Sequence, residues 1–225
     1  MMRVWIYILL VFIYSCNNKK NELISTLKRE SIQKNQLDNI QINQFKKLIK
    51  LYKEIKFDTL KVISESKKYE GRDIPRTLAV LFSKDLEPSK NKNISWYYAC
   101  YKFKIDNVKI GLITRTPSEY ASTSIKIFVL DTVKNKIENS FELAESWGDA
   151  GASWIVDSWL IKQKNILIYR QILETWDHNA DDSSYNQIDS KYYYHLIQLK
   201  NNRFDTLAIS KLKLEKTFKK LNNKK

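Results

Sequence analysis

Residues 97–112 read YYACYKFKIDNVKIGL, and this stretch decides the fold class. From Tyr97 to Ile105 every second side chain is apolar or aromatic, which is the period of a β-strand with one buried face. Asp106 and Asn107 then mark a tight turn, after which the alternation resumes through Leu112. Because a turn this short joins antiparallel neighbours, the stretch predicts a β-hairpin.

Further segments with the composition of strands follow this hairpin at short spacing. Turn residues separate them around Lys134–Lys136 and in the sequence Trp147–Gly151, which contains two of the four glycines of the chain. Since each segment is joined to the next by few residues, together they predict an antiparallel meander. The segments expected as strands are 125–129, 137–143, 153–161, 166–175, 191–200 and 203–209.

An internal similarity divides this meander into two halves. Leu112–Arg115 (LITR) is matched by Leu167–Arg170 (LIYR), and Lys134-Asn135 is matched by Lys200-Asn201. The similarity predicts two tandem four-stranded modules that form a strongly curved sheet or a sandwich, although any two such meanders would share part of it. The expected modules are residues 96–146 and 152–210.

Helical segments and short strands flank the meander. Over residues 37–57 the apolar side chains recur every three or four positions with lysines between them, which predicts an amphipathic helix facing a core. Residues 58–64 and 77–83 predict short strands, and Lys211–Leu221 predicts a short helix. The expected fold class is therefore mainly β with flanking helices (α+β). The corresponding domains are 37–93, a helix and short strands that pack on the body, and 94–225, the β domain.

The chain begins with an apolar segment that is too short to span a membrane. Arg3 supplies a positive charge, and Val4–Tyr14 is an unbroken apolar run of eleven residues. As a helix this run would rise about 16 Å, whereas the apolar core of a bilayer is about 30 Å thick. Its length is that of the hydrophobic region of a signal peptide.

The sequence Ile13-Tyr14-Ser15-Cys16 that ends this run resembles the lipobox of bacterial lipoproteins. An aliphatic residue stands three positions before the cysteine and a small residue stands directly before it. The resemblance covers residues 1–16, and it implies cleavage before Cys16, a diacylglyceryl thioether on its sulfur, and acylation of the new amino group by a fatty acid such as palmitate. An ordinary secretory signal and an uncleaved anchor are the alternatives.

This resemblance also implies a location for the protein. Residues 1–15 would be the signal peptide, and residues 16–36, rich in Asn, Lys, Ser and Gln, would be a lipidated tether. The protein would be held in the cell membrane or the outer membrane by its lipid anchor and would face the periplasm. The membrane is thus the first expected partner.

The formal net charge is +14, from 39 Lys and Arg against 25 Asp and Glu. Such an excess can attract nucleic acid, anionic lipid or acidic polysaccharide. A location outside the cytoplasm argues against nucleic acid as a partner. The lysines are also scattered along the chain except in the segment from Lys211 to Lys225, which favours a lysine-coated surface over a single charged patch.

The sequence lacks the common catalytic motifs. Its four glycines form no phosphate-binding loop and no nucleophile elbow, and its two cysteines cannot form a zinc cluster. We therefore expect no cofactor, and the missing motifs favour a protein that is not an enzyme.

Tryptophans and carboxylates gather in the second half of the chain. Aromatic rings beside carboxylates are a common means of holding sugars or cationic peptides, while buried tryptophans of a sheet core are the alternative. Strand alternation places Trp154 and Asp157 on opposite faces and places Trp159 with Asp157. The candidate ligand-binding residues are Trp147, Asp149, Trp154, Asp157, Trp159 and Trp176.

A second candidate site lies in the loop after residue 176. Asp177, Asn179 and Asp181 place oxygen ligands at alternate positions, as the start of a calcium-binding loop does. The sixth position of this loop is Asp182 instead of Gly and the twelfth is Ile188 instead of Glu, which favours a polar hairpin tip over a metal site.

Two functions are compatible with these features. The first is a lipid-anchored extracytoplasmic protein that acts as a binding or accessory module of the cell envelope, with an envelope protein or a glycan as its partner. The alternative is an extracytoplasmic hydrolase that uses carboxylates near the Trp147–Asp157 turn. Its candidate carboxylate pairs are Glu145 with Asp157 and Glu174 with Asp177.

Overall fold

The computed structural model describes residues 39–82, 96–118, 123–149, 151–178 and 188–223. The chain separates into two compact units, Met1–Gln44 and Phe45–Lys225. In the first unit the described residues 39–44 are helical. The second unit contains the whole β-sheet. The expected signal peptide and the tether with Cys16 lie outside the described residues.

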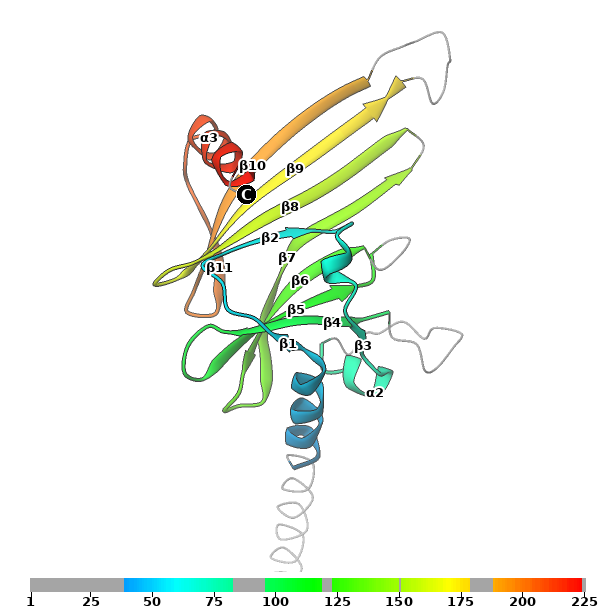
Figure 1. Cartoon of the computed structure of the whole chain (residues 1–225), viewed down its shortest axis with the longest axis vertical. Helices are drawn as coiled ribbons and strands as arrows, with labels where there is room; N and C mark the ends of the chain where they lie inside the picture. Colours follow the sequence, from blue (N-terminus) through cyan, green and yellow to red (C-terminus); the bar gives the residue numbers. More distant parts are fainter. Residues whose placement is uncertain (1–38, 83–95, 119–122, 150, 179–187, 224–225) are drawn as a thin grey trace, which may run out of the picture. The chain divides into compact units, whose positions relative to one another are not determined.

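The protein is mainly β, as the sequence predicts, and its strands form one open mixed sheet of eleven strands (Figure 1). The strands are β1 (Lys53–Glu54), β2 (Thr59–Ile63), β3 (Arg72–Asp73), β4 (Tyr98–Lys104), β5 (Lys109–Thr116), β6 (Ser124–Asp131), β7 (Lys136–Asp149), β8 (Ala152–Lys162), β9 (Ile166–Asp177), β10 (Ile188–Lys200) and β11 (Arg203–Leu207). Their order is β1-β4-β5-β6-β7-β8-β9-β10-β11, with β2 beside β8 and β3 beside β4. Only the pairing of β1 with β4 is parallel among the described strands.

The predicted meander is confirmed, because β4 to β11 follow one another as antiparallel neighbours. One boundary differs from the prediction. The sequence Trp147–Gly151 was expected to separate two strands, yet β7 continues through Asp149. Trp147 pairs with Trp154 of β8. Gly151, with a φ of 84°, adopts the left-handed conformation that glycine tolerates best, so the turn is narrower and lies later than predicted.

The N-terminal elements differ more from the sequence-based expectation. Residues 39–51 are helical, but the predicted helix over 37–57 is wrong at its end, because β1 begins at Lys53 and the backbone N–H of Ile55 donates to the carbonyl of Lys102 at 3.0 Å. This pairing with β4 overrides the helical periodicity. The segment 58–64 contains β2 as predicted.

The strand predicted over 77–83 is wrong, because α2 (Arg76–Ala79) occupies its first half. Pro75 precedes α2 directly, and the carbonyl of Pro75 accepts hydrogen bonds from the backbone N–H groups of Leu78 and Ala79. A proline is well tolerated at the start of a helix, where its missing N–H is not needed. The short 3-10 turn η1 (Lys67–Tyr69) precedes β3.

The strand β7 belongs to two parts of the sheet. Its residues up to Ala144 pair with β6, and from Glu145 onward they pair with β8. Two irregularities interrupt the pairing of β6 with β7, and such bulges bend a strand. On the same edge of β8, the residues that β7 does not reach, from Asp157 to Ile161, pair with β2.

As a result, the sheet curves and its inner face encloses one core. This core cluster draws buried side chains from β4, β5 and β6 and also from β8, β9 and β10. We call the face that it lines the inner face. The core cluster includes Phe103, Ile113, Ile127, Val129, Leu160, Ile168, Ile197 and Leu199.

Helices cover parts of the outer face. Phe45, Leu48 and Tyr52 are buried in a second cluster with α2 and with the outer side chains of β5 and β6. The hydroxyl group of Tyr52 lies 2.7 Å from the hydroxyl group of Thr114, and burial raises the pKa of this tyrosine far above its usual value. The helix α3 (Lys211–Asn222), predicted from the sequence, packs on β8, β9 and β10 in a third cluster.

The core makes a direct stability test possible. Leu160 is 0% exposed in the inner core, whereas Leu212 on α3 is 62% exposed. We expect Leu160→Ala to lower the free energy of unfolding by about 2–5 kcal/mol, because it removes buried methyl groups and leaves a cavity. The matched variant Leu212→Ala should change it by about 0.5 kcal/mol or less. Urea unfolding followed by tryptophan fluorescence measures both, and equal effects would contradict the assigned core.

Candidate functional site

The inner face changes from apolar to polar along β9. Ile166 and Ile168 belong to the inner core, and two positions further Arg170 lies on the same face. A guanidinium Nη2 of Arg170 donates to the Oε1 of Glu142 on β7 at 2.6 Å, and both side chains are about three-quarters or more buried. Arg170 also lies 5.7 Å from the ring centre of Phe141.

A second carboxylate lies beside this ion pair. Burial raises the pKa of Glu142, and the nearby charge of Glu145 raises it further, while Arg170 acts in the opposite direction. The hydroxyl of Ser118 donates to the Oε1 of Glu145 at 2.5 Å, and the hydroxyl of Ser124 donates to the Oε2 of Glu142 at 3.3 Å. The cluster therefore holds two carboxylates close together inside the curve of the sheet.

Two buried donors of the same region have no hydrogen-bond partner among the described residues. They are the hydroxyl of Ser158, whose residue is 0% exposed, and the Nε of Arg170. These residues are direct partners across β8 and β9, so the two donors lie side by side. Buried donors in proteins are nearly always satisfied, so two neighbouring donors without a partner are unusual. We call Glu142, Glu145, Ser158 and Arg170 the inner polar cluster.

Beyond this cluster the same face becomes aromatic. The far ends of β7, β8, β9 and β10 extend past β4, β5 and β6 (Figure 1). There the half-buried rings of Trp147 and Trp154 stack at 6.3 Å with an angle of 16°. Glu174 is the partner of Trp154 across β8 and β9, and its Oε2 accepts a hydrogen bond from the hydroxyl of Tyr193 at 3.0 Å. We call these four residues the tryptophan face.

The structure divides the six predicted ligand-binding residues between the two faces of the sheet. Trp147 and Trp154 lie together on the inner face. By strand alternation Trp176, which is 40% exposed, and the exposed Asp149 share that face near the strand ends. The remaining two, Asp157 and Trp159, lie on the outer face, so the six residues do not form one site.

Trp159 on the outer face has a structural role. It is 8% exposed and packs against Phe218 and Leu221 of α3. Its indole N–H donates to the side-chain oxygen of Asn222 at 3.0 Å, and the amine of Lys61 lies 5.5 Å from the centre of its ring. The contacts with Phe218, Leu221 and Asn222 hold α3 on the sheet, whereas Lys61 belongs to β2.

Asp157 is the other predicted ligand-binding residue on the outer face. Burial raises the pKa of its carboxyl group, the charge of Lys61 lowers it, and the charge of Glu65 raises it again. One carboxylate oxygen, Oδ1, is buried without a hydrogen-bond partner among the described residues. Asp157 is thus a largely buried carboxyl group on the outer face of β8, and burial disfavours its charged form.

The carboxylate pairs suggested by the sequence do not face one another. Glu145 pairs with Val156, so alternation turns the next residue, Asp157, to the other side of the sheet. Glu174 and Asp177 are three positions apart on one strand, which also places them on opposite faces. The pair that the structure does bring together, Glu142 with Glu145, was not singled out by sequence reasoning. A charged Arg170 within the alternation of Ile166, Ile168 and Ile172 was the available signal.

Only one of the three candidate calcium ligands is described. Asp177 ends β9, and its backbone N–H donates to the carbonyl of Gly151 at 2.7 Å. Asn179 and Asp181 lie outside the described residues. Within residues 39–82, 96–118, 123–149, 151–178 and 188–223 there is no group of three or more His, Cys, Asp or Glu placed to hold a metal ion.

Cys100 is a buried thiol, in agreement with its place in an apolar strand. It is 5% exposed, and its thiol donates to the carbonyl of Tyr69 at 3.3 Å. Burial raises its pKa to about 11, so it is a protonated thiol at neutral pH. Because the thiolate is the reactive form, Cys100 is unsuited to nucleophilic chemistry.

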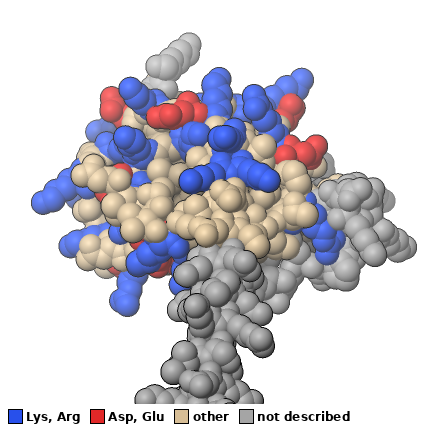
Figure 2. Space-filling model, turned by 90° about the horizontal axis from the view of Figure 1, so that it is seen from below, with Lys and Arg blue, Asp and Glu red and all other residues tan. Residues whose placement is uncertain are grey.

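On the face seen in Figure 2 the charged side chains are distributed and do not form a single patch. Figure 2 shows Lys and Arg side chains spread around one face of the molecule, with fewer Asp and Glu side chains between them. This distribution agrees with the scattering of lysines along the sequence. Among the helices that the structure describes, none is both long enough and apolar enough to cross a bilayer.

Comparison with known proteins gives no match. No family model, no curated protein and no solved structure matches the chain. The arrangement of side chains on the sheet is therefore the basis for assigning a function.

The desolvated carboxylate of Asp157 predicts a dependence of stability on pH. Because the pKa is raised above its usual 3.8 in the folded protein, the folded chain binds more protons than the unfolded chain above that pH. The free energy of unfolding therefore falls as the pH rises from 3.8 through the folded-state pKa. Asp157→Asn removes this loss. We expect the variant to gain stability over the wild type as the pH is raised from about 4 to about 7.

The control is Leu212→Ala, which changes an exposed residue of α3 that does not titrate. Its stability difference from the wild type should stay constant over the same pH range. Urea unfolding at each pH measures both differences. A difference for Asp157→Asn that does not change with pH would contradict the desolvated carboxylate.

Proposed function

We propose that the protein is a lipid-anchored binding module of the bacterial cell envelope and that it holds a glycan chain on its tryptophan face. The observation that supports this most is the stack of Trp147 on Trp154, 6.3 Å apart and half buried, beside Glu174. Aromatic rings bind the apolar faces of sugars, and carboxylates accept hydrogen bonds from sugar hydroxyls.

The neighbouring residues suit the same ligand. Tyr193 orients the carboxylate of Glu174 through its hydroxyl group, and the amine of Lys191 lies 4.8 Å from the ring centre of Tyr193. The inner polar cluster follows on the same face, where the side chains of Glu142 and Arg170 are partly exposed. A linear ligand could thus pass from an aromatic surface to a polar one without leaving the inner face.

The anchor part of the proposal comes from the sequence alone. The apolar run Val4–Tyr14, the lipobox resemblance at residues 13–16 and the polar segment after it support lipidation of Cys16 and display in the periplasm. A tethered position would keep the binding face close to envelope polymers. A protein partner of the envelope is the other occupant compatible with this location.

We also infer that the two meanders, β4–β7 and β8–β11, are copies of one module. Ile113 and Ile168 occupy matching positions and both lie in the inner core, each two residues before an arginine of the same face. Asn135 and Asn201 occupy matching turns and both have a positive φ, of 49° and 50°. These agreements support the sequence similarity between the two halves.

The binding proposal predicts the effect of removing the stacked rings. The full-length protein should co-sediment with insoluble peptidoglycan or chitin, used as glycan probes. Trp154→Ala should weaken this binding about tenfold, which corresponds to the loss of roughly 1.4 kcal/mol of ring stacking. Because Trp154 is half buried at the end of the strands, the variant should still fold, and its thermal unfolding checks this.

The control is Trp96→Ala, which removes a 50% exposed tryptophan that precedes β4. An equal loss of binding in both variants, or no binding of the wild type to either polymer, would contradict the proposal. If the wild type breaks down the polymer and Glu142→Gln does not, the alternative of an extracytoplasmic hydrolase is favoured. The raised pKa of Glu142 beside Glu145 is a feature of acid–base pairs.

The anchor predicts a change of cellular fraction. In a bacterial host that processes lipoproteins, the wild type should remain with the membranes, and labelled palmitate should be incorporated. Cys16→Ser removes the acylated sulfur, so the label should be lost and the protein should no longer be held by acyl chains. The control Cys100→Ser changes the other, buried cysteine and should keep the label. An unmodified Cys16 in the mass spectrum of the purified protein would exclude the anchor.

A further inference from the structure

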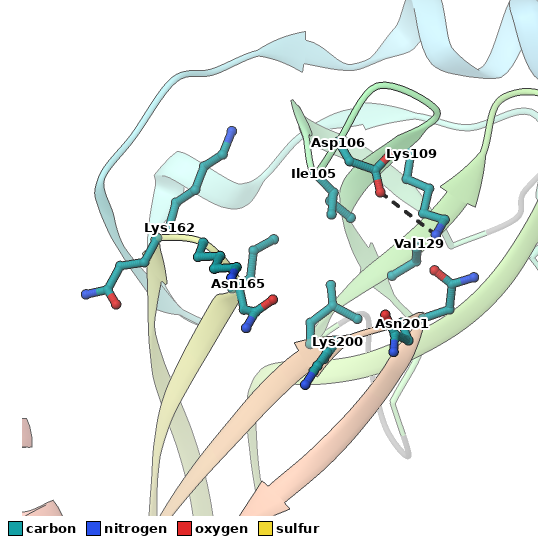
Figure 3. Close-up of a pocket in the computed structure, with 13 residues that line it drawn as sticks. Ile105, Asp106, Lys109, Val129, Lys162, Asn165, Lys200 and Asn201 are labelled. Atoms are coloured by element: carbon teal, nitrogen blue, oxygen red, sulfur yellow. Dashed lines mark ion pairs between the residues drawn. The ribbon is translucent and has the colours of Figure 1, made fainter.

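A small pocket lies at the end of the sheet where three turns meet. These turns follow β4, β8 and β10, and the pocket between them has a volume of about 170 Å³. Figure 3 shows Asp106 and Lys109 on one side, Lys162 and Asn165 on another, and Lys200 and Asn201 on a third. The lining thus combines residues that are about a hundred positions apart in the chain but close in the fold.

The floor of this pocket is apolar. Val129, Ile166 and Leu199 line it, and all three are buried members of the inner core. The pocket therefore lies directly over the inner core at this end of the sheet. Water screens charges poorly above such a floor, so a charge held there interacts more strongly than on an open surface.

The rim of the pocket is strongly cationic. It holds four lysines, Lys109, Lys162, Lys164 and Lys200, against the single carboxylate of Asp106. Asp106 lies 3.8 Å from the amine of Lys109, and the amine of Lys162 donates to the carbonyl of Lys104 at 2.6 Å. Three lysine charges are thus left without a carboxylate within the lining.

Asparagine amides add neutral donors to this rim. Asn201 and Asn202 form the turn between β10 and β11 with φ values of 50° and 65°. Two positive φ values are typical of the type I′ turn, whose second position glycine usually occupies. An asparagine at that position adopts a backbone conformation that is less favourable for it than for glycine. In return it places a side-chain amide at the rim, and Asn165 places a further amide there.

We propose that this pocket binds the phosphate group of a phosphomonoester. Ammonium and amide groups are hydrogen-bond donors, and a phosphate group offers several anionic acceptor oxygens to them. The volume of about 170 Å³ exceeds the roughly 30 Å³ of one water and is below the roughly 300–1,000 Å³ of clefts for drug-sized ligands. It therefore fits a single headgroup, either of an anionic lipid or of a free phosphate compound.

This site is independent of the proposed glycan face. Lys162 lies eight positions after Trp154 on β8, which at about 3.3 Å per residue places them roughly 26 Å apart. A ligand in the pocket would not touch the tryptophan face. Failure of one proposal therefore leaves the other standing.

The test uses the purified full-length protein and isothermal titration calorimetry with two probes. Inorganic phosphate represents the free ligand, and dihexanoyl phosphatidic acid, kept below its micelle concentration, represents the lipid headgroup. We expect binding of at least one probe, with an affinity that falls as salt is added. Dihexanoyl phosphatidylcholine, which has no phosphomonoester, should bind at least tenfold more weakly than the phosphatidic acid.

The double variant Lys164→Gln/Lys200→Gln removes two exposed rim charges and should weaken binding of the effective probe at least tenfold. The matched variant Lys213→Gln/Lys216→Gln removes two exposed charges of α3 and should leave the affinity unchanged. Binding of phosphatidic acid alone identifies a lipid headgroup as the ligand, and binding of both probes shows that phosphate suffices. Binding of neither probe, or equal losses in the two variants, would overturn the proposal.

Discussion

The fold depends on the change of partner within β7. Its first part pairs with β6 as far as Ala144, and its second part pairs with β8 from Glu145 onward. Because β7 passes from β6 to β8, the strands β8 to β10 form a second wall of the inner core opposite β4 to β6. The bulged pairing with β6 supplies the bend. One strand thus joins two four-stranded meanders and also sets the angle at which their apolar sides meet.

The same bend explains why the inner face has regions of different chemistry. The inner side chains of β8, β9 and β10 are apolar where β4, β5 and β6 lie opposite, and Arg170 and the tryptophan face lie further along the same strands, with Val156 and Ile172 between them. Alternation continues along β8 and β9, so Trp154, Ser158 and Arg170 stay on the inner face, whereas the bulged pairing of β7 with β6 brings Glu142 and Glu145, three positions apart, to that same face. The stacked tryptophans are therefore positioned by regular pairing of β7 with β8, and the polar cluster is positioned by the bulge of β7.

The sequence predicted the features that depend on residues close together in the chain. Alternation and short turns placed β4 to β11 within a few residues except at the end of β7, and strand parity correctly separated Trp154 from Asp157. What it missed depends on distant partners. β1 is a strand only because β4 is beside it, and Glu142 meets Arg170 only because β7 bends. The apolar run after Pro75 has the composition of a strand, but it begins as a helix directly after this proline.

The pairing of β2 with β8 has a consequence for how the chain folds. Thr59 meets Ile161, so the contact closes a loop of roughly a hundred residues, which is slow compared with the closure of any hairpin in the meander. Until β2 arrives, half of one edge of β8 is left with unpaired backbone groups, and such an edge can recruit a strand from another molecule. The pairing of β2 therefore also protects this edge of β8 from self-association.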